Sequence, residues 1–163
     1  MKHELKDLKF KVNGKDVEVK VTPKILLLEL LREELKLTGT RTGCEVSACG
    51  ACTVNLDGKA VRACSILAIQ ADGHEVVTIE GVADGEKLHP LQDAMVKAGA
   101  IECGFCTSGM VMSARALLLD NPKPSRDDIK KALQWNLCAD SGYVRYIDAI
   151  EMAAGQMQGN GRQ

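Results

Sequence analysis

The fold is decided by the stretch CEVSACGAC, residues 44–52, and by a further cysteine, Cys64, that follows it. The spacing C-x4-C-x2-C with a distant fourth cysteine is the plant-type pattern for a [2Fe–2S] cluster held by four thiolates. Thiolates are the soft ligands that such clusters prefer. Small residues between the cysteines let the backbone wrap closely and point its N–H groups at the sulfur atoms. We therefore predict an iron–sulfur site whose ligands are Cys44, Cys49, Cys52 and Cys64.

The same cysteines have two other interpretations, a zinc site and a set of buried free thiols. Structural zinc sites usually contain two close pairs of cysteine or histidine ligands. This stretch is instead one long loop with one remote partner, Cys64. Iron is therefore the favoured metal.

The composition is that of a globular protein. Of the 163 residues, 45% are apolar and 26% are charged, and the formal net charge is −1. This length suffices for one ordinary domain or two small ones. There is no long basic run, so we expect no nucleic-acid partner. The longest apolar run, residues 25–28, is far shorter than the roughly 20 residues that cross a bilayer, so we expect no membrane span.

The N-terminus and the cysteine content indicate a compartment. Residues 1–7 are polar and lack the apolar region of a signal peptide. Seven cysteines without such a signal indicate cofactor ligands in a reducing environment, not a disulfide framework. We expect a cytoplasmic metalloprotein.

The first half of the chain alternates apolar and polar residues as β-strands do. Asn13-Gly14 and Asp57-Gly58 are typical hairpin turns, and the second hairpin would return Cys64 to the cysteine loop. Thr22-Pro23 predicts a helix start, with threonine as the N-cap and proline at the first helical position. The elements expected in order are a hairpin (8–21), a helix (from 22), a second hairpin (53–63), a short helical run (66–69) and a last strand (76–79). They describe a β-grasp sheet of the plant-type ferredoxin kind over residues 1–82.

After residue 82 the alternation stops and only helical spacing is left. Four short helices are expected, and Ser125 with Asp128 resembles a capping box at the start of the third. Their expected positions are from Pro90 to Gly99, around 110–118, from Ser125, and 143–154. The polar tail, residues 155–163, is expected to fray. The predicted fold class is therefore α+β, an N-terminal β-grasp domain followed by a C-terminal four-helix bundle domain over residues 83–163.

A second group of cysteines lies in the helical half. Cys103 and Cys106 form a C-x2-C pair where the first two helices meet, and Cys138 lies near the end of the third. Alone, such a pair is equally typical of a thioredoxin-like redox motif or of half a zinc site. With Cys138 it supplies three of the four ligands of a second [2Fe–2S] cluster, so spacing alone leaves these alternatives open.

Three segments, residues 43–54, 102–110 and 136–143, resemble the iron–sulfur subunit of the xanthine oxidase family of molybdenum hydroxylases. The resemblance runs from the first hairpin to the fourth helix. It implies two [2Fe–2S] clusters, one in each domain. It also implies a large molybdopterin-binding subunit that holds the substrate and a medium FAD-binding subunit, assembled as a dimer of heterotrimers. This chain would then relay single electrons from molybdopterin to FAD and would turn over no substrate alone.

The chain departs from the family pattern beside its second group of cysteines. Asp140 stands where the family has its fourth cysteine ligand. A carboxylate can bind iron, although it is a harder donor than a thiolate. The resemblance thus makes Asp140 a candidate ligand beside Cys103, Cys106 and Cys138, and the alternative is that Asp140 points to solvent.

Two further departures concern the molybdenum cofactor. Glu102 replaces a glutamine that, in the family, approaches the pterin together with backbone near the cysteine at position 138, and Ser108 replaces a proline. Glu102 and Cys138 are therefore the residues expected near molybdopterin. A glutamate accepts hydrogen bonds but, when ionised, cannot donate one as glutamine does.

Two other functions are compatible with these motifs. One is a free-standing ferredoxin-like electron carrier or redox sensor, although a carrier does not need the helical half. The other is a metal-storage or assembly scaffold, which would release its clusters readily.

Overall fold

Alternating apolar residues build a mixed five-stranded sheet in the N-terminal half of the computed structural model, which describes residues 4–160. Its strands are β1 (Lys6–Val12), β2 (Lys15–Val21), β3 (Thr53–Leu56), β4 (Lys59–Arg62) and β5 (Glu75–Val77). The strand order is β2-β1-β5-β3-β4, and β5 runs parallel to β1 but antiparallel to β3. Both expected hairpins are confirmed, and each turns on residues with positive φ, Asn13-Gly14 and Asp57-Gly58.

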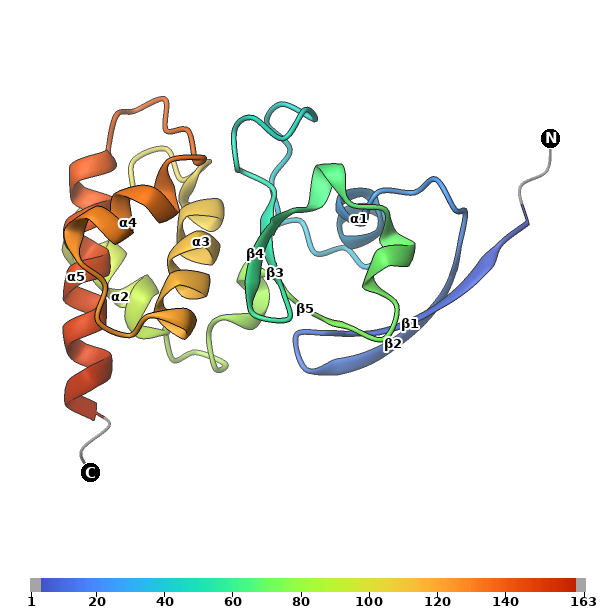
Figure 1. Cartoon of the computed structure of the whole chain (residues 1–163), viewed down its shortest axis with the longest axis horizontal. Helices are drawn as coiled ribbons and strands as arrows, with labels where there is room; N and C mark the ends of the chain where they lie inside the picture. The colour runs from blue at the N-terminus through green and yellow to red at the C-terminus, as the bar shows by residue number, and fades with distance from the viewer. Residues whose placement is uncertain (1–3, 161–163) are drawn as a thin grey trace.

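One short helical segment covers a face of this sheet (Figure 1). It consists of α1 (Leu27–Glu29) and a π-helical turn, η1 (Leu30–Glu34). The helix start expected at Thr22-Pro23 is wrong. Residues 23–24 form a turn instead, and Leu26 is extended because it bridges to Leu67 and the Leu27 N–H donates to the Ile66 carbonyl at 2.7 Å. The actual N-cap is Leu26, whose N–H donates to the Glu29 carboxylate.

Three single turns of 3-10 helix connect the remaining parts of the sheet half: η2 (Ala63–Ser65), η3 (Ala68–Ala71) and η4 (Ile79–Gly81). The last strand ends at Val77, two residues earlier than expected. It stops there because the Thr78 N–H donates to the Asn13 side chain at 2.8 Å instead of to a neighbouring strand.

Four helices form the C-terminal half: α2 (Pro90–Lys97), α3 (Thr107–Asp120), α4 (Arg126–Leu133) and α5 (Tyr143–Asn160). The capping box of Ser125 and Asp128 is confirmed. The expectation that residues 155–160 fray is wrong, because α5 continues through them and Gln158 donates to the Pro122 carbonyl at 2.8 Å. Residues 161–163 of that tail, like residues 1–3 at the polar start, lie outside the described part of the chain.

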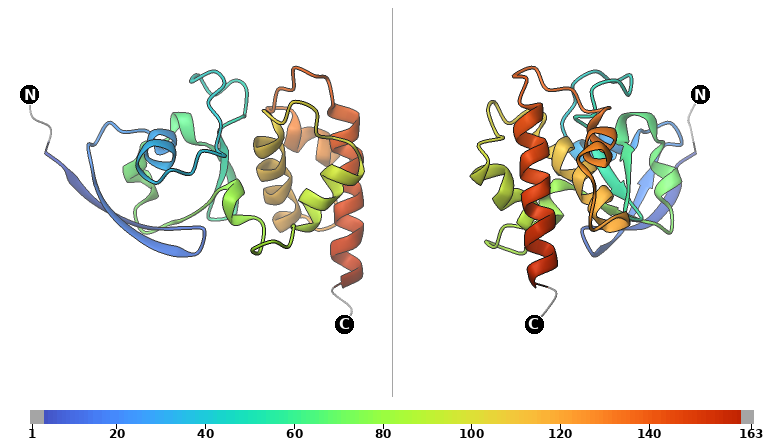
Figure 2. Two further views of the ribbon diagram at one scale, coloured as in Figure 1. Left: turned by 180° about the vertical axis from the view of Figure 1, so that it is seen from behind. Right: turned by 60° about the vertical axis from the view of Figure 1, so that its left-hand side comes forward.

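Helix α3 lies against the sheet, whereas α5 lies on the far side of the helical half (Figures 1 and 2). Buried apolar side chains gather in two separate cores, one between the sheet and α1 and one among α2–α5. Within residues 4–160, no helix is long and apolar enough to cross a membrane.

Two buried asparagines join the halves. Asn55 on β3 donates to the Met112 carbonyl at 2.9 Å and accepts from Arg115 at 2.8 Å. Asn136, only 3% exposed, donates to the Gly50 carbonyl at 3.1 Å and accepts from Ser113 at 2.8 Å. Because buried polar groups are costly when unpaired, these bonds fix how the cysteine loop sits on the helical half.

Candidate metal centres

The first three cysteines lie in an irregular loop between η1 and β3, the projecting loop at the top of Figure 1. The fourth, Cys64, lies in η2, directly after β4. The antiparallel pairing of β3 and β4 opposes Thr53 to Arg62, and the Ala63 N–H donates to the Cys52 carbonyl at 3.2 Å. The hairpin therefore returns Cys64 to Cys52, as its sequence predicts.

Backbone N–H groups of the loop point at the first sulfur. Glu45 and Ser47 both have positive φ, 57° and 60°, which costs of order 1 kcal/mol or more for a non-glycine residue. This curl brings the N–H groups of Ala48 and Cys49 to 3.3 Å from the Cys44 sulfur. Hydrogen bonds from the backbone, first of all that of Val46, lower the pKa of Cys44 to about 7. The loop thus favours a thiolate at Cys44 even before a metal binds.

The thiols of this site lie close enough together to influence one another's ionisation. Burial raises the pKa of Cys49, and the interaction with the Cys44 thiol raises it further. Burial likewise raises the pKa of Cys52 to about 12, with a further contribution from Cys64. Four neighbouring thiols match the four cysteine ligands of a [2Fe–2S] cluster. Within residues 4–160, no three histidine, cysteine, aspartate or glutamate side chains converge on the position of a single metal ion.

At two positions of this loop, close packing leaves no space for a side chain larger than that of glycine. A Cβ on Gly43 would lie 2.9 Å from the Cys49 sulfur. Gly50 has a φ of +72°, and a Cβ there would collide with the Trp135 carbonyl. The closely packed loop around the thiols therefore fits a compact inorganic cluster. The geometry of the loop also depends on the helical half.

The second group of cysteines is assembled from helix ends. Cys103 and Cys106 lie in the turn that leads into α3, and Cys138 lies between α4 and α5. Cys106 is 7% exposed, and burial together with the neighbouring Cys138 and Cys103 thiols raises its pKa to about 11. The Gly142 N–H lies 3.5 Å from the Cys138 sulfur. The structure thus brings these three cysteines together from segments that are distant in the sequence.

The two acidic residues expected at this second site are both exposed. Asp140 accepts a hydrogen bond from the Cys103 N–H at 3.3 Å, so its carboxylate faces the turn that carries the first two cysteines. Glu102 lies 3.5 Å from Arg145, which also donates to the Gly99 carbonyl. The donor set at this site, three thiols and one adjacent carboxylate, is compatible with a cluster that has one oxygen ligand.

The sequence analysis missed one residue at this site. Tyr146, 1% exposed on α5, has its hydroxyl 3.3 Å from the Cys106 sulfur and 3.0 Å from the Thr107 hydroxyl. Burial and the contact with Cys106 raise the pKa of Tyr146. In the sequence, Tyr146 is marked only by its position in a predicted helix, one residue before the inward-facing Ile147. That position does not indicate that its hydroxyl contacts Cys106.

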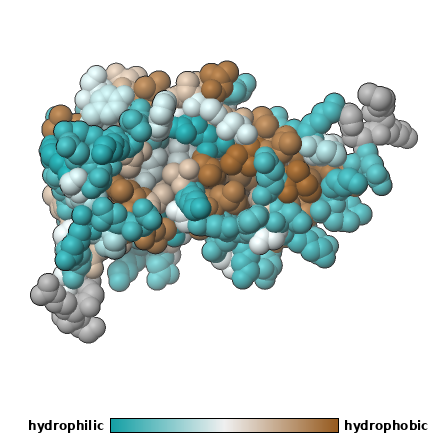
Figure 3. Space-filling model, in the orientation of Figure 1, coloured by the Kyte–Doolittle hydropathy of each residue, from teal (hydrophilic) through white to brown (hydrophobic). Residues whose placement is uncertain are grey.

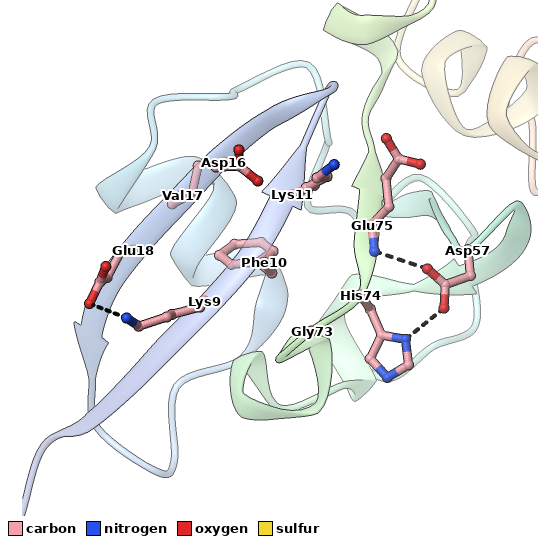
Figure 4. A pocket seen from close by; sticks show the side chains of 10 residues that line it. All are labelled: Lys9, Phe10, Lys11, Asp16, Val17, Glu18, Asp57, Gly73, His74 and Glu75. Carbon is pink, nitrogen blue, oxygen red and sulfur yellow. Dashed lines mark hydrogen bonds and ion pairs between the residues drawn. The ribbon is translucent and has the colours of Figure 1, made fainter.

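A surface hollow away from the cysteines lies over the sheet (Figure 4). Its described lining includes no cysteine, and two pairs of its charged side chains interact with each other. Asp57 accepts from His74 at 2.6 Å and from the Glu75 N–H at 2.9 Å, while Lys9 pairs with Glu18 at 3.0 Å. We therefore assign it no part in the metal chemistry.

Comparisons with known proteins agree with this geometry. Residues 10–86 match a family described as a 2Fe-2S iron-sulfur cluster binding domain, and residues 78–151 match a [2Fe-2S] binding domain. The nicotine 6-hydroxylase small subunit of Paenarthrobacter nicotinovorans is 44% identical over 93% of this chain and 91% of its own length. The nicotinate dehydrogenase small FeS subunit of Eubacterium barkeri is 42% identical over 87% of this chain and 90% of its own.

A solved structure of quinoline 2-oxidoreductase from Pseudomonas putida 86 matches with a TM-score of 0.90 and 42% identity, over 98% of this chain and 99% of that one. The aldehyde oxidoreductase of Megalodesulfovibrio gigas is 46% identical over 91% of this chain, which corresponds to 17% of that longer protein. The same two cluster-binding parts thus occur both as separate subunits and within a larger chain. This chain belongs to the iron–sulfur small subunits of the xanthine oxidase family of molybdenum hydroxylases, which are parts of oxidoreductase complexes.

Proposed function

We propose that this chain relays single electrons between a large molybdopterin-binding subunit and a medium FAD-binding subunit through two [2Fe–2S] clusters. When bound, each cluster supplies a centre that takes up and returns one electron. The first would be held by Cys44, Cys49, Cys52 and Cys64, and the second by Cys103, Cys106, Cys138 and Asp140. The protein alone would turn over no substrate.

The observation that carries this proposal is the direct contact between the two cysteine groups. The Leu137 N–H donates to the Cys49 carbonyl at 2.8 Å. Cys49 belongs to the first group, and Leu137 immediately precedes Cys138 of the second. A single hydrogen bond thus links the backbones of the two sites. Two centres placed so closely would divide a long transfer of an electron into short steps.

We divide the chain into a ferredoxin-like domain, residues 1–82, and a four-helix bundle domain, residues 83–163. The two separate hydrophobic cores support a division into two domains, and the chain passes from the first core to the second between Val76 and Val82, at the end of the first proposed domain. The outermost residues of both proposed domains, 1–3 and 161–163, lie outside the described structure.

We propose Asp140 as the fourth ligand of the second cluster, because its carboxylate already faces the Cys103 turn. An oxygen ligand should change the reduction potential and the electron paramagnetic resonance (EPR) signal of this cluster relative to an all-sulfur one. Asp140→Cys should restore an all-sulfur spectrum. If the spectrum of the second cluster does not change in that variant, Asp140 is not a ligand.

Exposed apolar side chains near the cysteines support docking onto partner subunits. Val46, in the cysteine loop, is 74% exposed. Figure 3 shows brown, hydrophobic surface at the top of the molecule, where this loop projects in Figure 1. Phe105 and Leu137 are also exposed, beside the second group. We propose that molybdopterin lies near Glu102 and Cys138 and that the complex is a dimer of heterotrimers. We also propose that the complex is cytoplasmic, because thiol ligands stay reduced there.

Size-exclusion chromatography of native material tests the subunit assignment. The proposal predicts that this chain elutes with a molybdopterin-containing chain and an FAD-containing chain. A stable monomer of native origin that keeps its iron would instead indicate a free-standing ferredoxin-like carrier. Rapid loss of iron and sulfide to a chelator would indicate a storage or assembly scaffold.

A further inference from the structure

We propose that the Tyr146 hydroxyl donates a hydrogen bond to the Cys106 sulfur and so raises the reduction potential of the second cluster. Tyr146 would be a positioning residue that acts on the cluster through its cysteine ligand. This inference rests on the proposed function in one respect, namely that Cys106 binds the second cluster.

The hydroxyl is held in place by its surroundings. Tyr146 lies near the start of α5 and reaches the N-terminus of α3, where its oxygen is 3.3 Å from the Cys106 sulfur and 3.0 Å from the Thr107 hydroxyl. The tyrosine is 1% exposed, so water cannot readily replace either partner. One turn earlier on the chain, Gly142 lies beside the ring, and its carbonyl accepts a hydrogen bond from the Tyr146 N–H at 3.1 Å.

The direction of the hydrogen bond follows from the number of protons. A metal-bound cysteine is a thiolate, which accepts hydrogen bonds but has no proton to donate. The tyrosine has one hydroxyl proton and the threonine has one. Both contacts are satisfied if Thr107 donates to the tyrosine oxygen and Tyr146 donates to the sulfur. The reverse arrangement would leave the Cys106 thiolate facing an oxygen lone pair at 3.3 Å.

A donor at this position favours the reduced cluster. Reduction adds one negative charge, part of which resides on the ligand sulfurs, and a hydrogen bond to sulfur stabilises that charge. Burial strengthens the effect because the effective dielectric constant is lower inside the protein than in water. In the first group the corresponding donors to Cys44 are backbone N–H groups. Cys106 has a side-chain donor instead, which a substitution can remove without changing the backbone.

The test is a redox titration of the full chain in its complex, followed by low-temperature EPR. Tyr146→Phe keeps the ring and removes the hydroxyl. We expect the second cluster to bind its electron about tenfold more weakly, which for one electron is a potential lower by about 59 mV. The first cluster should keep its potential. Thr107→Val is the matched control, because it leaves the tyrosine proton no partner except the sulfur and should not lower the potential.

A second measurement does not depend on the phenylalanine variant keeping its cluster. The chain has two tyrosines, so in a Tyr143→Phe background Tyr146 is the one site that incorporates fluorotyrosine. A fluorinated phenol is a stronger donor, and the potential of the second cluster should rise relative to the same variant without fluorine.

Unchanged potentials overturn the proposal for Tyr146, whether in Tyr146→Phe with full iron content or with fluorotyrosine. Either result would leave the electron-transfer function intact. The absence of a second cluster signal from the unmodified complex would instead overturn the proposed function of this half. A loss of the cluster in Tyr146→Phe leaves the decision to the fluorotyrosine measurement.

Discussion

The two cysteine groups are built on different structural principles. The first is local: three cysteines share one loop, and one hairpin returns the fourth to them. The second depends on packing, because Cys103 and Cys106 precede α3 while Cys138 lies between α4 and α5. Backbone N–H groups approach a sulfur atom in both groups, and the second group also has the buried Tyr146 hydroxyl 3.3 Å from the Cys106 sulfur. A local site is specified by its own segment, and an assembled site depends on the whole helical half.

The largest effect should come from removing a ligand of the local site. Cys64→Ala should abolish the first cluster and leave the second, so that about half of the iron is lost. Iron and sulfide quantitation with EPR measures both. Ser65→Ala, at the exposed next residue, is the control and should keep all the iron. Loss of both clusters in Cys64→Ala would contradict the independence of the two sites.

Removal of iron should sharpen the contrast between the sites. Residues 44–52 form no helix or strand, and Glu45 and Ser47 hold strained positive φ angles. Without metal we expect their amide hydrogens to exchange rapidly, while the centres of α3 and α5 stay protected. Hydrogen-exchange mass spectrometry before and after chelation reports this. Equal protection of residues 44–52 in both states would show that the loop does not need the metal.

Gly50 tests how far the local site depends on the helical half. Gly50→Ala combines a positive φ with a collision against the Trp135 carbonyl, and it should cost about 2–4 kcal/mol of the free energy of unfolding. Gly73→Ala is a matched control, because its φ is +74° and no atom lies within 4 Å of the added Cβ. It should cost about 1 kcal/mol. Chemical denaturation measures both, and equal losses would show that the contact with the helical half is unimportant.

The smallest effect should come from removing a side-chain helix cap in the helical half. Ser125 caps α4 through the Asp128 N–H at 3.2 Å, and Ser125→Ala should cost about 1 kcal/mol. Lys131→Ala, an exposed site on the same helix, should change stability by less than about 0.5 kcal/mol. Both cluster signals should persist in the two variants. A change in the first cluster on loss of this cap would mean that distant helix ends control the local site.

The hairpin that returns Cys64 to the cysteine loop could be predicted from the sequence, because it follows from one loop and one turn. Asp57-Gly58 forces the hairpin, and the hairpin places Cys64 beside Cys52. The order of elements and the helix starts at Pro90 and Ser125 were predicted for the same reason, since capping signals act within a few residues.

Long-range contacts account for what could not be predicted. The helix start at Thr22-Pro23 was wrong because Leu26 pairs with Leu67, which is distant in the sequence. The contact of Tyr146 with Cys106 spans 40 positions and depends on the packing of α5 beside α3. Local patterns contain no information on which side chain a buried hydroxyl will meet.

The most direct test of the account is low-temperature EPR of the chemically reduced chain, with iron, sulfide and zinc quantified in the same anaerobic sample. The account predicts two distinguishable [2Fe–2S] signals of equal intensity, with matching iron and sulfide and no stoichiometric zinc. One signal, accounting for all the iron, would contradict the two-centre relay. Zinc in place of iron at the Cys44–Cys64 site would contradict the account as a whole.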